Sequence, residues 1–386
     1  RIYIYGDYDV DGVSSTSILY IYFKSIGFPV KYYIPNRLEE GYGINEEAIK
    51  KISDDGCDLI ITVDCGITSV KEVELANELG IDVIITDHHE CQSDIPNAYA
   101  IVNPKQEECT YPFDMLCGCG VTFKLIQALT PKEVFKTTMY DYLEIVTLAT
   151  ICDIVPLIDE NRIIVKNGLK LMKEGKNLGL RELIKVCGIE TSKIGSSHIG
   201  YSVGPRINAS GRLGYSYLGV QLFTTDFEDE AKEIANILES KNIERQMIES
   251  KMYKEAEDII ASNESYKEDK VLVVAKEGWQ HGIIGIVAFI AFILEPIFLA
   301  LKDKKFIKSI NVNDIFLIAL FIVFAMHSYP LEVLYLPTIS YSLPLFYCYI
   351  KQKDMKSRMK SRSGGIFAAV SDKVLEAGGV GYGCAL

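Results

Sequence analysis

The sequence predicts an α/β fold with a parallel sheet, and two observations support this prediction. Over residues 1–155, short runs of β-branched residues alternate with amphipathic stretches, the pattern of strands connected by helices that cover a sheet. The first four runs are each followed within a few residues by polar or acidic side chains. An open α/β sheet places its ligand site at the carboxyl ends of its strands, so we expect the functional residues at this edge.

Five strands and four helices are expected in this part of the chain. The strands are expected at residues 2–5, 30–34, 59–63, 83–86 and 100–102. The helices are expected at residues 12–25, 45–53, 69–79 and 120–128. Asn45 and Ser69 are good N-cap residues, because an acidic residue follows each of them in the first turn or shortly after it.

The pattern after residue 140 is mostly helical. Over residues 140–185, an apolar motif at residues 151–156 interrupts the helical pattern. Residues 226–262 form a long stretch rich in Glu, Lys and Ile, which is typical of a helix that bridges two domains. The β-like run at residues 271–275 predicts the start of a second α/β domain.

The chain becomes apolar at about residue 282. Residues 282–301 are about long enough to cross a bilayer, whereas residues 314–326 are short for a membrane span. Residues 351–386 are first basic and then rich in glycine. This uneven distribution explains a mean hydropathy of +0.14, which is high for a chain with 24% charged residues.

Composition excludes several protein classes. A chain of 386 residues that is 48% hydrophobic is neither a disordered polyelectrolyte nor a disulfide mini-protein. A net charge of −12 argues against a basic nucleic-acid-coating protein, although an enzyme with a local positive groove is still allowed. The ten cysteines lack paired spacing and indicate reduced thiols in a cytosolic protein. The chain opens at Arg1 directly in a strand, without a signal peptide, and we expect a fragment whose natural N-terminus is missing.

Three carboxylates follow the first expected strand, within the motif Gly6-Asp7-Tyr8-Asp9-Val10-Asp11-Gly12. Carboxylates this close repel one another unless a cation lies among them, so the motif predicts a site for a hard metal ion. An acidic turn or a calcium loop is the alternative. An EF-hand loop needs a preceding helix and an acid at its twelfth position, where Ile18 stands, and we therefore discount that form of calcium site.

Two further strand ends carry metal-ligating residue types. Asp64 follows the third expected strand, and Asp87, His88 and His89 follow the fourth. Carboxylate and imidazole ligands together favour Mn²⁺ or Mg²⁺ over a pure calcium cage, while Zn²⁺ stays chemically open. By contrast, the pair in Cys117-Gly-Cys119 is interpreted as a turn of small residues rather than as a metal site.

Asp153 is isolated in the apolar run Ala149-Thr-Ile-Cys-Asp-Ile-Val-Pro156. A buried carboxylate without a partner costs several kcal/mol, so a cation or hydrogen-bond donors should face it. A helix-capping aspartate is the alternative interpretation.

The order of these motifs resembles that of the DHH phosphoesterase superfamily, in GDYDVDG, VDCGIT, TDHHE and ATICDIVPL. The segments around Arg37, Asn103-Pro-Lys and Gly204-Pro-Arg-Ile-Asn208-Ala-Ser-Gly-Arg212 resemble the RecJ branch of single-strand-specific 5′→3′ DNA exonucleases. A late segment, Glu277-Gly-Trp-Gln-His281-Gly, resembles the opening of the associated DHHA1 domain. The resemblance covers about residues 1–288.

The resemblance implies a two-metal centre that binds Mn²⁺ or Mg²⁺. Its implied metal ligands are Asp9, Asp11, Asp64, His88 and Asp153. Asp7 is counted with the metal-binding residues as a close neighbour that ligates or orients, and His89 is a second such neighbour. Asp64, His88 and His89 are the implied catalytic residues, and no covalent nucleophile is needed. The implied substrate phosphate contacts are Arg37, Asn208, Arg212 and His281. For the two arginines, a surface salt bridge is the alternative role.

The resemblance also implies a domain organisation. The expected segments are 1–155, the DHH catalytic α/β core; 156–225, its helical remainder; 226–265, a connecting helix; 266–288, a truncated DHHA1-like segment; 289–350, an apolar segment that resembles part of a membrane protein; and 351–386, a basic and then Gly-rich tail. The last two segments are unrelated to the family. A rearranged or mis-joined coding sequence is the favoured explanation.

The implied function is metal-dependent 5′→3′ hydrolysis of single-stranded DNA in DNA repair and recombination, in the cytoplasm. Single-strand-binding protein and a helicase are partners implied by the same resemblance. Three alternatives stay open: a phosphodiesterase for oligoribonucleotides or cyclic dinucleotides, an inactive or weakened truncated remnant that binds metal only, and an enzyme tethered to a membrane by its apolar tail.

Overall fold

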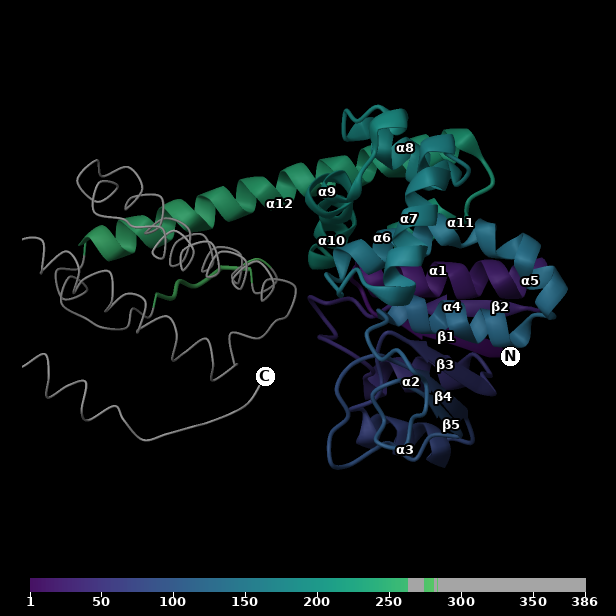
Figure 1. Cartoon of the computed structure of the whole chain (residues 1–386). Coiled ribbons are helices and arrows are strands. Elements are labelled where there is room, and N and C mark those ends of the chain that lie inside the picture. Colours follow the sequence, from purple (N-terminus) through teal and green to yellow (C-terminus); the bar gives the residue numbers. More distant parts are fainter. Residues whose placement is uncertain (263–273, 281–282, 284–386) are drawn as a thin grey trace, which may run out of the picture. The chain divides into compact units, whose positions relative to one another are not determined.

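The computed structural model describes residues 1–262, 274–280 and 283 (Figure 1). The expected tail at residues 289–386, most of the DHHA1-like segment and His281 lie outside these residues. No helix in the described part of the chain is long and apolar enough to cross a membrane.

The core is a five-stranded parallel sheet with the strand order β2-β1-β3-β4-β5. The strands are β1 (Ile2–Gly6), β2 (Val30–Tyr33), β3 (Leu59–Val63), β4 (Asp82–Thr86) and β5 (Ala100–Val102). All five therefore form where β-branched and apolar runs predict them. The central strands β1 and β3 are buried almost throughout, as a sheet covered on both faces requires.

Helices cover both faces of the sheet (Figure 1). Helices α2 (Glu46–Asp54) and α3 (Val70–Glu78) pack on the face to which Tyr3, Tyr5 and Ile60 contribute. Helices α1 (Val10–Ser25) and α4 (Gly118–Leu129) pack on the opposite face, with Ile4 and Ile61. Neighbouring residues of one strand thus face different layers, which is the period-two rule of a strand.

The N-caps of two helices were predicted, with different outcomes. Asn45 caps α2, because its side-chain oxygen accepts a hydrogen bond from the Ala48 N–H. Ser69 is the N-cap residue of α3, as predicted, but its side chain accepts no hydrogen bond from a helix N–H.

The chain continues as a helical layer beyond the sheet. Its elements are α5 (Lys132–Thr138), η1 (Met139–Asp141), α6 (Leu143–Cys152), α7 (Asp159–Glu174), α8 (Leu178–Val186), η2 (Thr191–Lys193), α9 (Ser196–His198), η3 (Ile199–Val203), α10 (Gly204–Arg212), α11 (Tyr217–Thr224) and α12 (Glu228–Ser262). The long helix predicted at 226–262 is α12, and it packs against α8, α10 and α11. Of the run 271–275, residues 274 and 275 are described, and neither lies in a strand.

Candidate metal centre

The register of the sheet brings four chemically active loops to one level. Gly6 of β1 lies beside Val63 of β3, Val63 lies beside Thr86 of β4, and Thr86 lies beside Val102 of β5. Each of these residues is the last of its strand. The next residues, Asp7, Asp64, Asp87 and Asn103, therefore leave the sheet along the same edge.

The turn after β1 fixes two carboxylates through helix N-termini. Asp9 is the N-cap of α1, where its Oδ1 accepts hydrogen bonds from the N–H groups of Asp11 and Gly12 at 2.8 and 3.0 Å. Asp11 reaches across to α4 and accepts hydrogen bonds from the N–H groups of Gly118 and Cys119 at 2.6 and 2.8 Å. The first turn of a helix favours negative charge, so the amino termini of α1 and α4 also stabilise these carboxylates electrostatically.

Asp64 has a left-handed backbone, with φ of 61°. A non-glycine residue is uncommon there, and aspartate is one of the few residue types that tolerates the conformation. In this conformation the Asp64 side chain lies against the start of α4. There is room for it there only because residue 118 is a glycine. A Cβ atom on Gly118 would lie 2.4 Å from Asp64 Oδ1.

The loop after β4 contains one orienting residue and two histidines. Asp87 Oδ1 accepts hydrogen bonds from the N–H groups of His88 and His89 and contacts His89 Nδ1 at 2.7 Å. Its Oδ2 accepts a hydrogen bond from the Ile67 N–H. Asp87 therefore holds the loop and the His89 ring, while His88 points toward the other acids.

His88 is the point at which the motifs meet. Its Nε2 lies 3.2 Å from Asp64 Oδ1, 3.7 Å from Asp11 Oδ2 and 3.8 Å from Asp153 Oδ2. Asp153 reaches this position from the carboxyl end of α6, where Ile154 turns the chain with a left-handed φ of 58°. Asp153 is thus not an N-cap, and among the described residues its buried Oδ2 has no hydrogen-bond partner.

The donor atoms form three overlapping groups that can each hold a cation. These groups are Asp7, Asp9 and Asp64; Asp64, His88 and His89; and Asp11, His88 and Asp153. Within each group the ligand atoms lie within 4.8 Å of one another. The groups share Asp64 and His88, so the arrangement fits adjacent ions rather than one isolated ion.

The electrostatics of the cluster also fit a divalent cation. Burial first, and then the repulsion of neighbouring carboxylates, raises the pKa of Asp64 and of Asp153 well above the usual range. Asp64 Oδ1, like Asp153 Oδ2, is buried without a hydrogen-bond partner among the described residues. Buried oxygen atoms left unpaired in this way are costly, and Mn²⁺ or Mg²⁺ satisfies them with its preferred oxygen and imidazole ligands.

The two histidines differ in their protonation. Burial lowers the pKa of His88 to about 4, so its ring is neutral and ready to bind a metal near pH 7. For His89, burial works in the same direction, but the hydrogen bond to Asp87 and the charges of Asp87 and Asp9 outweigh it and raise the pKa. His89 is therefore the histidine that is better suited to carry a proton.

The predicted phosphate contacts lie on separate elements. The guanidinium carbon of Arg37 lies 4.7 Å from the centre of the ring of Tyr8, which belongs to the first acidic motif. Asn208 Oδ1 accepts a hydrogen bond from the Val10 N–H at 3.1 Å, so α10 lies against the start of α1. Arg212 ends α10, and its charge opposes the upward effect of burial on the pKa of Glu249. The positive charge of Arg212 thus acts on an acid of α12.

Sequence reasoning missed two residues near the cluster. Tyr42 is 49% exposed as a whole, yet burial and the charges of Asp7 and Asp64 raise the pKa of its hydroxyl. Glu40 organises the same loop, because it accepts hydrogen bonds from the Asn36 N–H, the Tyr33 hydroxyl and the Asn45 amide. A Tyr among many in a Gly-rich loop carries no sequence signal that separates it from a surface residue.

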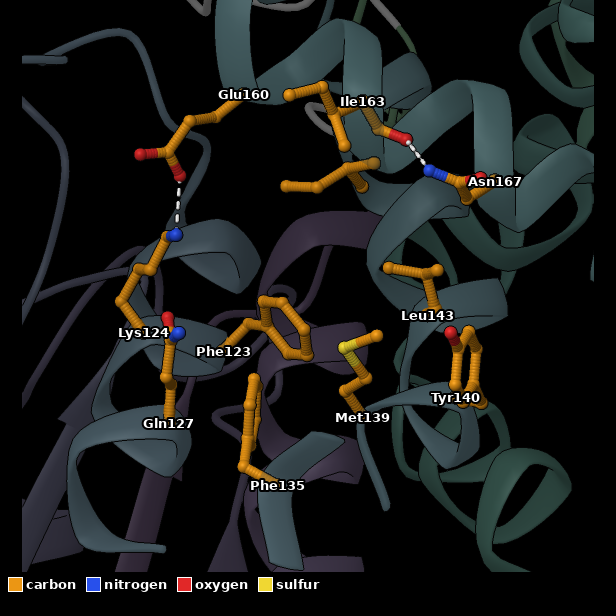
Figure 2. Close-up of a pocket in the computed structure, with 11 residues that line it drawn as sticks. Phe123, Lys124, Gln127, Phe135, Met139, Tyr140, Leu143, Glu160, Ile163 and Asn167 are labelled. Carbon is orange, nitrogen blue, oxygen red and sulfur yellow. Dashed lines mark hydrogen bonds and ion pairs between the residues drawn. The ribbon is translucent and has the colours of Figure 1, made fainter. Parts of the chain in front are cut away.

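A separate pocket of about 330 Å³ lies among α4, α5, α6 and α7 (Figure 2). Phe123 and Phe135 lie next to each other in its lining, with ring centroids 5.3 Å apart. Lys124 and Glu160 form an ion pair at its rim. The lining contains none of the predicted site residues, so this pocket is distinct from the acidic edge.

Comparisons with known proteins identify a family and several relatives to which this chain is similar. Residues 1–150 match the DHH family, N-terminal domain. The single-stranded-DNA-specific exonuclease RecJ of Bacillus subtilis (strain 168) is 44% identical over 291 residues, which is 75% of this chain and 36% of that protein. The chain thus spans little more than a third of the length of this relative.

Two solved structures share the fold. A crystal structure of exonuclease RecJ bound to manganese matches with a TM-score of 0.65 and 33% identity, over 75% of this chain and 71% of that chain. A crystal structure of RecJ from Thermus thermophilus in complex with Mg²⁺ matches with a TM-score of 0.55 and 26% identity, over 75% of this chain and 38% of that chain.

Proposed function

The chain belongs to the DHH family, in its RecJ branch, and from this premise we propose that it hydrolyses single-stranded DNA from the 5′ end in a metal-dependent reaction. One observation carries the proposal. Asp64 Oδ1 and Asp153 Oδ2, both buried and without hydrogen-bond partners among the described residues, converge with Asp11 on His88 Nε2. This is a preformed place for cations at the carboxyl edge of an open α/β sheet.

The proposed roles follow from the positions of the residues. Asp7, Asp9, Asp11, Asp64, His88 and Asp153 hold the cations. When bound, two divalent cations supply an activated water and positive charge against the attacking and leaving oxygens of the phosphodiester. Asp87 orients His89, whose raised pKa suits it to hold a proton beside the reacting phosphate.

The substrate is held by groups outside the cluster in this proposal. Arg37 above Tyr8 and Arg212 at the end of α10 bind phosphates, and a planar guanidinium binds a phosphate through two hydrogen bonds. Asn208 fixes α10 against α1 through the Val10 N–H, which supports a positioning role. The segments 1–155, 156–225 and 226–265, the cytoplasmic location and the two protein partners are part of the same proposal.

The test is nuclease activity of the purified chain on a 5′-labelled single-stranded oligonucleotide with Mn²⁺ or Mg²⁺. We expect release of mononucleotides, loss of activity with EDTA, and loss of activity in Asp64→Ala. Equal rates on a dinucleotide and on the long strand would instead favour a small-substrate phosphodiesterase. A chain that binds Mn²⁺ but neither retains nor cuts the strand would contradict the proposal.

A further inference from the structure

We propose that Lys105 is an additional substrate-binding residue, which holds a phosphate that flanks the scissile one on the β5 side of the metal centre. The inference rests on the function proposed above and names a contact that extends it. Its basis is the place of Lys105 in the sheet, the hydrogen-bonded turn that holds it, and its exposed ion pair with Glu90.

Lys105 follows β5, the outer strand at one end of the sheet edge. Val102, the last residue of β5, lies beside Thr86, and the Asp87 N–H donates a hydrogen bond to the Val102 carbonyl. Adjacent strands lie about 4.8 Å apart, so the loop after β5 leaves the sheet next to the loop with His88 and His89. Lys105 is therefore one strand away from the cation-binding residues.

A small hydrogen-bonded turn holds Lys105 in place. The Lys105 N–H donates to Asn103 Oδ1 at 2.8 Å, and the Asn103 amide donates to the His89 carbonyl at 2.9 Å. Asn103 is buried, with 2% of its surface exposed. The Gln106 amide closes the turn from the other side through the carbonyl of Ile101 at 3.2 Å. The backbone of Lys105 is thus tied to the same loop as the histidines, which preorganises its side chain.

The resting partner of Lys105 is easily exchanged. Its Nζ lies 2.9 Å from Glu90 Oε1, and the side chains of Lys105 and Glu90 are 28% and 83% exposed. An ion pair with so exposed an acid contributes little, whereas a phosphate offers more acceptor oxygens and more charge. A strand that binds here displaces Glu90 from Lys105.

The position also complements the other cations in the proposed substrate path. Arg37 follows β2, at the opposite end of the strand order from β5, and the acidic cluster lies between them after β1, β3 and β4. A strand laid along this edge with its scissile phosphate at the cluster has neighbouring phosphates on both sides. Lys105 supplies positive charge on the β5 side.

The test compares Lys105→Gln with Lys170→Gln, which removes an exposed lysine of α7, in the full chain. We expect Lys105→Gln to raise KM for a single-stranded oligonucleotide about tenfold with kcat nearly unchanged, as for a lost charge-assisted contact. The slope of log affinity against log salt should fall by about 0.7. Mn²⁺ affinity should stay equal or increase, because a cation near the ligands has been removed.

In a second pair of variants, we expect the first to change KM in the opposite direction. Glu90→Gln frees Lys105 and should lower KM, whereas Glu108→Gln removes a nearby exposed charge without touching Lys105 and should change KM less. The inference is overturned if Lys105→Gln behaves like Lys170→Gln, if it lowers kcat with KM unchanged, or if it weakens Mn²⁺ binding.

A binding measurement separates this inference from the proposed function. Fluorescence anisotropy with a labelled oligonucleotide is compared between the chains with Asp64→Asn alone and with Asp64→Asn plus Lys105→Gln, so that the strand stays intact. A wild-type chain that cuts no strand refutes the proposed activity. A weaker binding of the double variant, with a smaller salt slope, still supports the contact of Lys105 with phosphate, and equal binding or no binding by either chain refutes it.

Discussion

Gly118 lies so close to Asp64 that a hydrogen atom is the largest substituent its Cα tolerates. A Cβ atom there would lie 2.4 Å from Asp64 Oδ1 and 2.6 Å from Asp64 Cβ. The same Gly118 donates its N–H to Asp11 Oδ2. The start of α4 therefore sets the position of two carboxylates that follow different strands, although it contains no charged residue in its first turn.

The first prediction is that Gly118→Ala disrupts the metal centre. The methyl group must push Asp64 out of the left-handed position that points it toward His88 Nε2. We expect Mn²⁺ affinity to fall about tenfold or more, and overpacking to cost about 1–3 kcal/mol of the free energy of unfolding. Isothermal titration with Mn²⁺ and thermal unfolding measure the two effects.

Gly120→Ala is the matched control in the same helix. Its added Cβ would approach Leu116 at 3.2 Å and Cys117 Sγ at 3.7 Å, and it would not approach a carboxylate. We expect Mn²⁺ affinity close to that of the wild type. Equal losses of Mn²⁺ affinity in Gly118→Ala and Gly120→Ala would show that α4 acts through general packing rather than through Asp64.

The second prediction concerns the stability of the metal-free chain. Asp64→Asn removes a carboxylate whose charged form is disfavoured by burial and by neighbouring acids. Asparagine also tolerates the left-handed backbone at this position. In EDTA we expect Asp64→Asn to be more stable than the wild type by roughly 1 kcal/mol, a rise in Tm of a few degrees. Asp64→Ala should be less stable than Asp64→Asn by about 1–2 kcal/mol, because alanine is strained at φ of 61°.

Mn²⁺ should reverse this order. The wild-type chain gains stability from the ion, about 2.7 kcal/mol at 100 times the dissociation constant, and the variants gain much less. Differential scanning fluorimetry with EDTA and with Mn²⁺ checks both parts. A wild type that stays less stable than Asp64→Asn in saturating Mn²⁺ would contradict the assignment of Asp64 as a ligand.

The third prediction is a pH dependence of the metal effect. In the metal-free chain, burial and charge repulsion raise the pKa values of Asp11, Asp64 and Asp153, so these groups take up protons more readily than in the unfolded chain. Lowering the pH from 8 toward 5 therefore stabilises the metal-free fold relative to the unfolded chain and opposes cation binding. The rise in Tm on adding Mn²⁺ should shrink over this range, and a constant rise would refute the protonation argument.

The fourth prediction concerns the loop with Arg37 and Tyr42. Burial acts to raise the pKa of Glu40, but hydrogen bonds from Asn36, Tyr33 and Asn45 outweigh it and lower the pKa below 4.5. The ionised carboxyl therefore stabilises the fold above pH 4.5, and this contribution is lost as the pH falls through the lowered pKa.

Glu40→Gln should accordingly lower Tm at pH 7 and have a diminishing effect in acid. Limited proteolysis of the loop should also become faster, because a neutral side chain at position 40 accepts the hydrogen bonds of Asn36, Tyr33 and Asn45 more weakly. Glu39→Gln, an exposed neighbour, is the control and should change neither measurement. Thermal unfolding of the three chains between pH 3 and 7 tests this prediction. A difference in Tm between the wild type and Glu40→Gln that grows in acid would contradict it.

Much of the sheet could be predicted from sequence because its signals are local. The five strands are short apolar runs, and each observed boundary lies within one residue of the expected one. Helices α5 to α11 were not predicted individually: residues 140–185 were predicted only as mostly helical, and α5, α9, α10 and α11 are short. Ser69 shows the limit of cap rules: a suitable residue type before a helix does not make the hydrogen bond unless its backbone angles allow it.

The residues of the candidate site also fall into those that local sequence signals predict and those that they do not. Acids and histidines at strand ends are visible in the sequence, since parallel strands share a carboxyl edge. The partners of these residues come from far along the chain and leave no local signal. Gly118 beside Asp64, and Glu249 near Arg212, depend on the packing of α4 and α12.

The hydrogen bonds from α4 to Asp11 also predict an order of events during folding. They connect residues 107 and 108 positions apart, and four of the five strands lie in the intervening chain. Contacts between such distant segments form late, because the loop between them must first be ordered. A nascent chain that has emerged only as far as β5 lacks this support. Cation uptake during synthesis or refolding therefore reports that the sheet and its covering helix have docked.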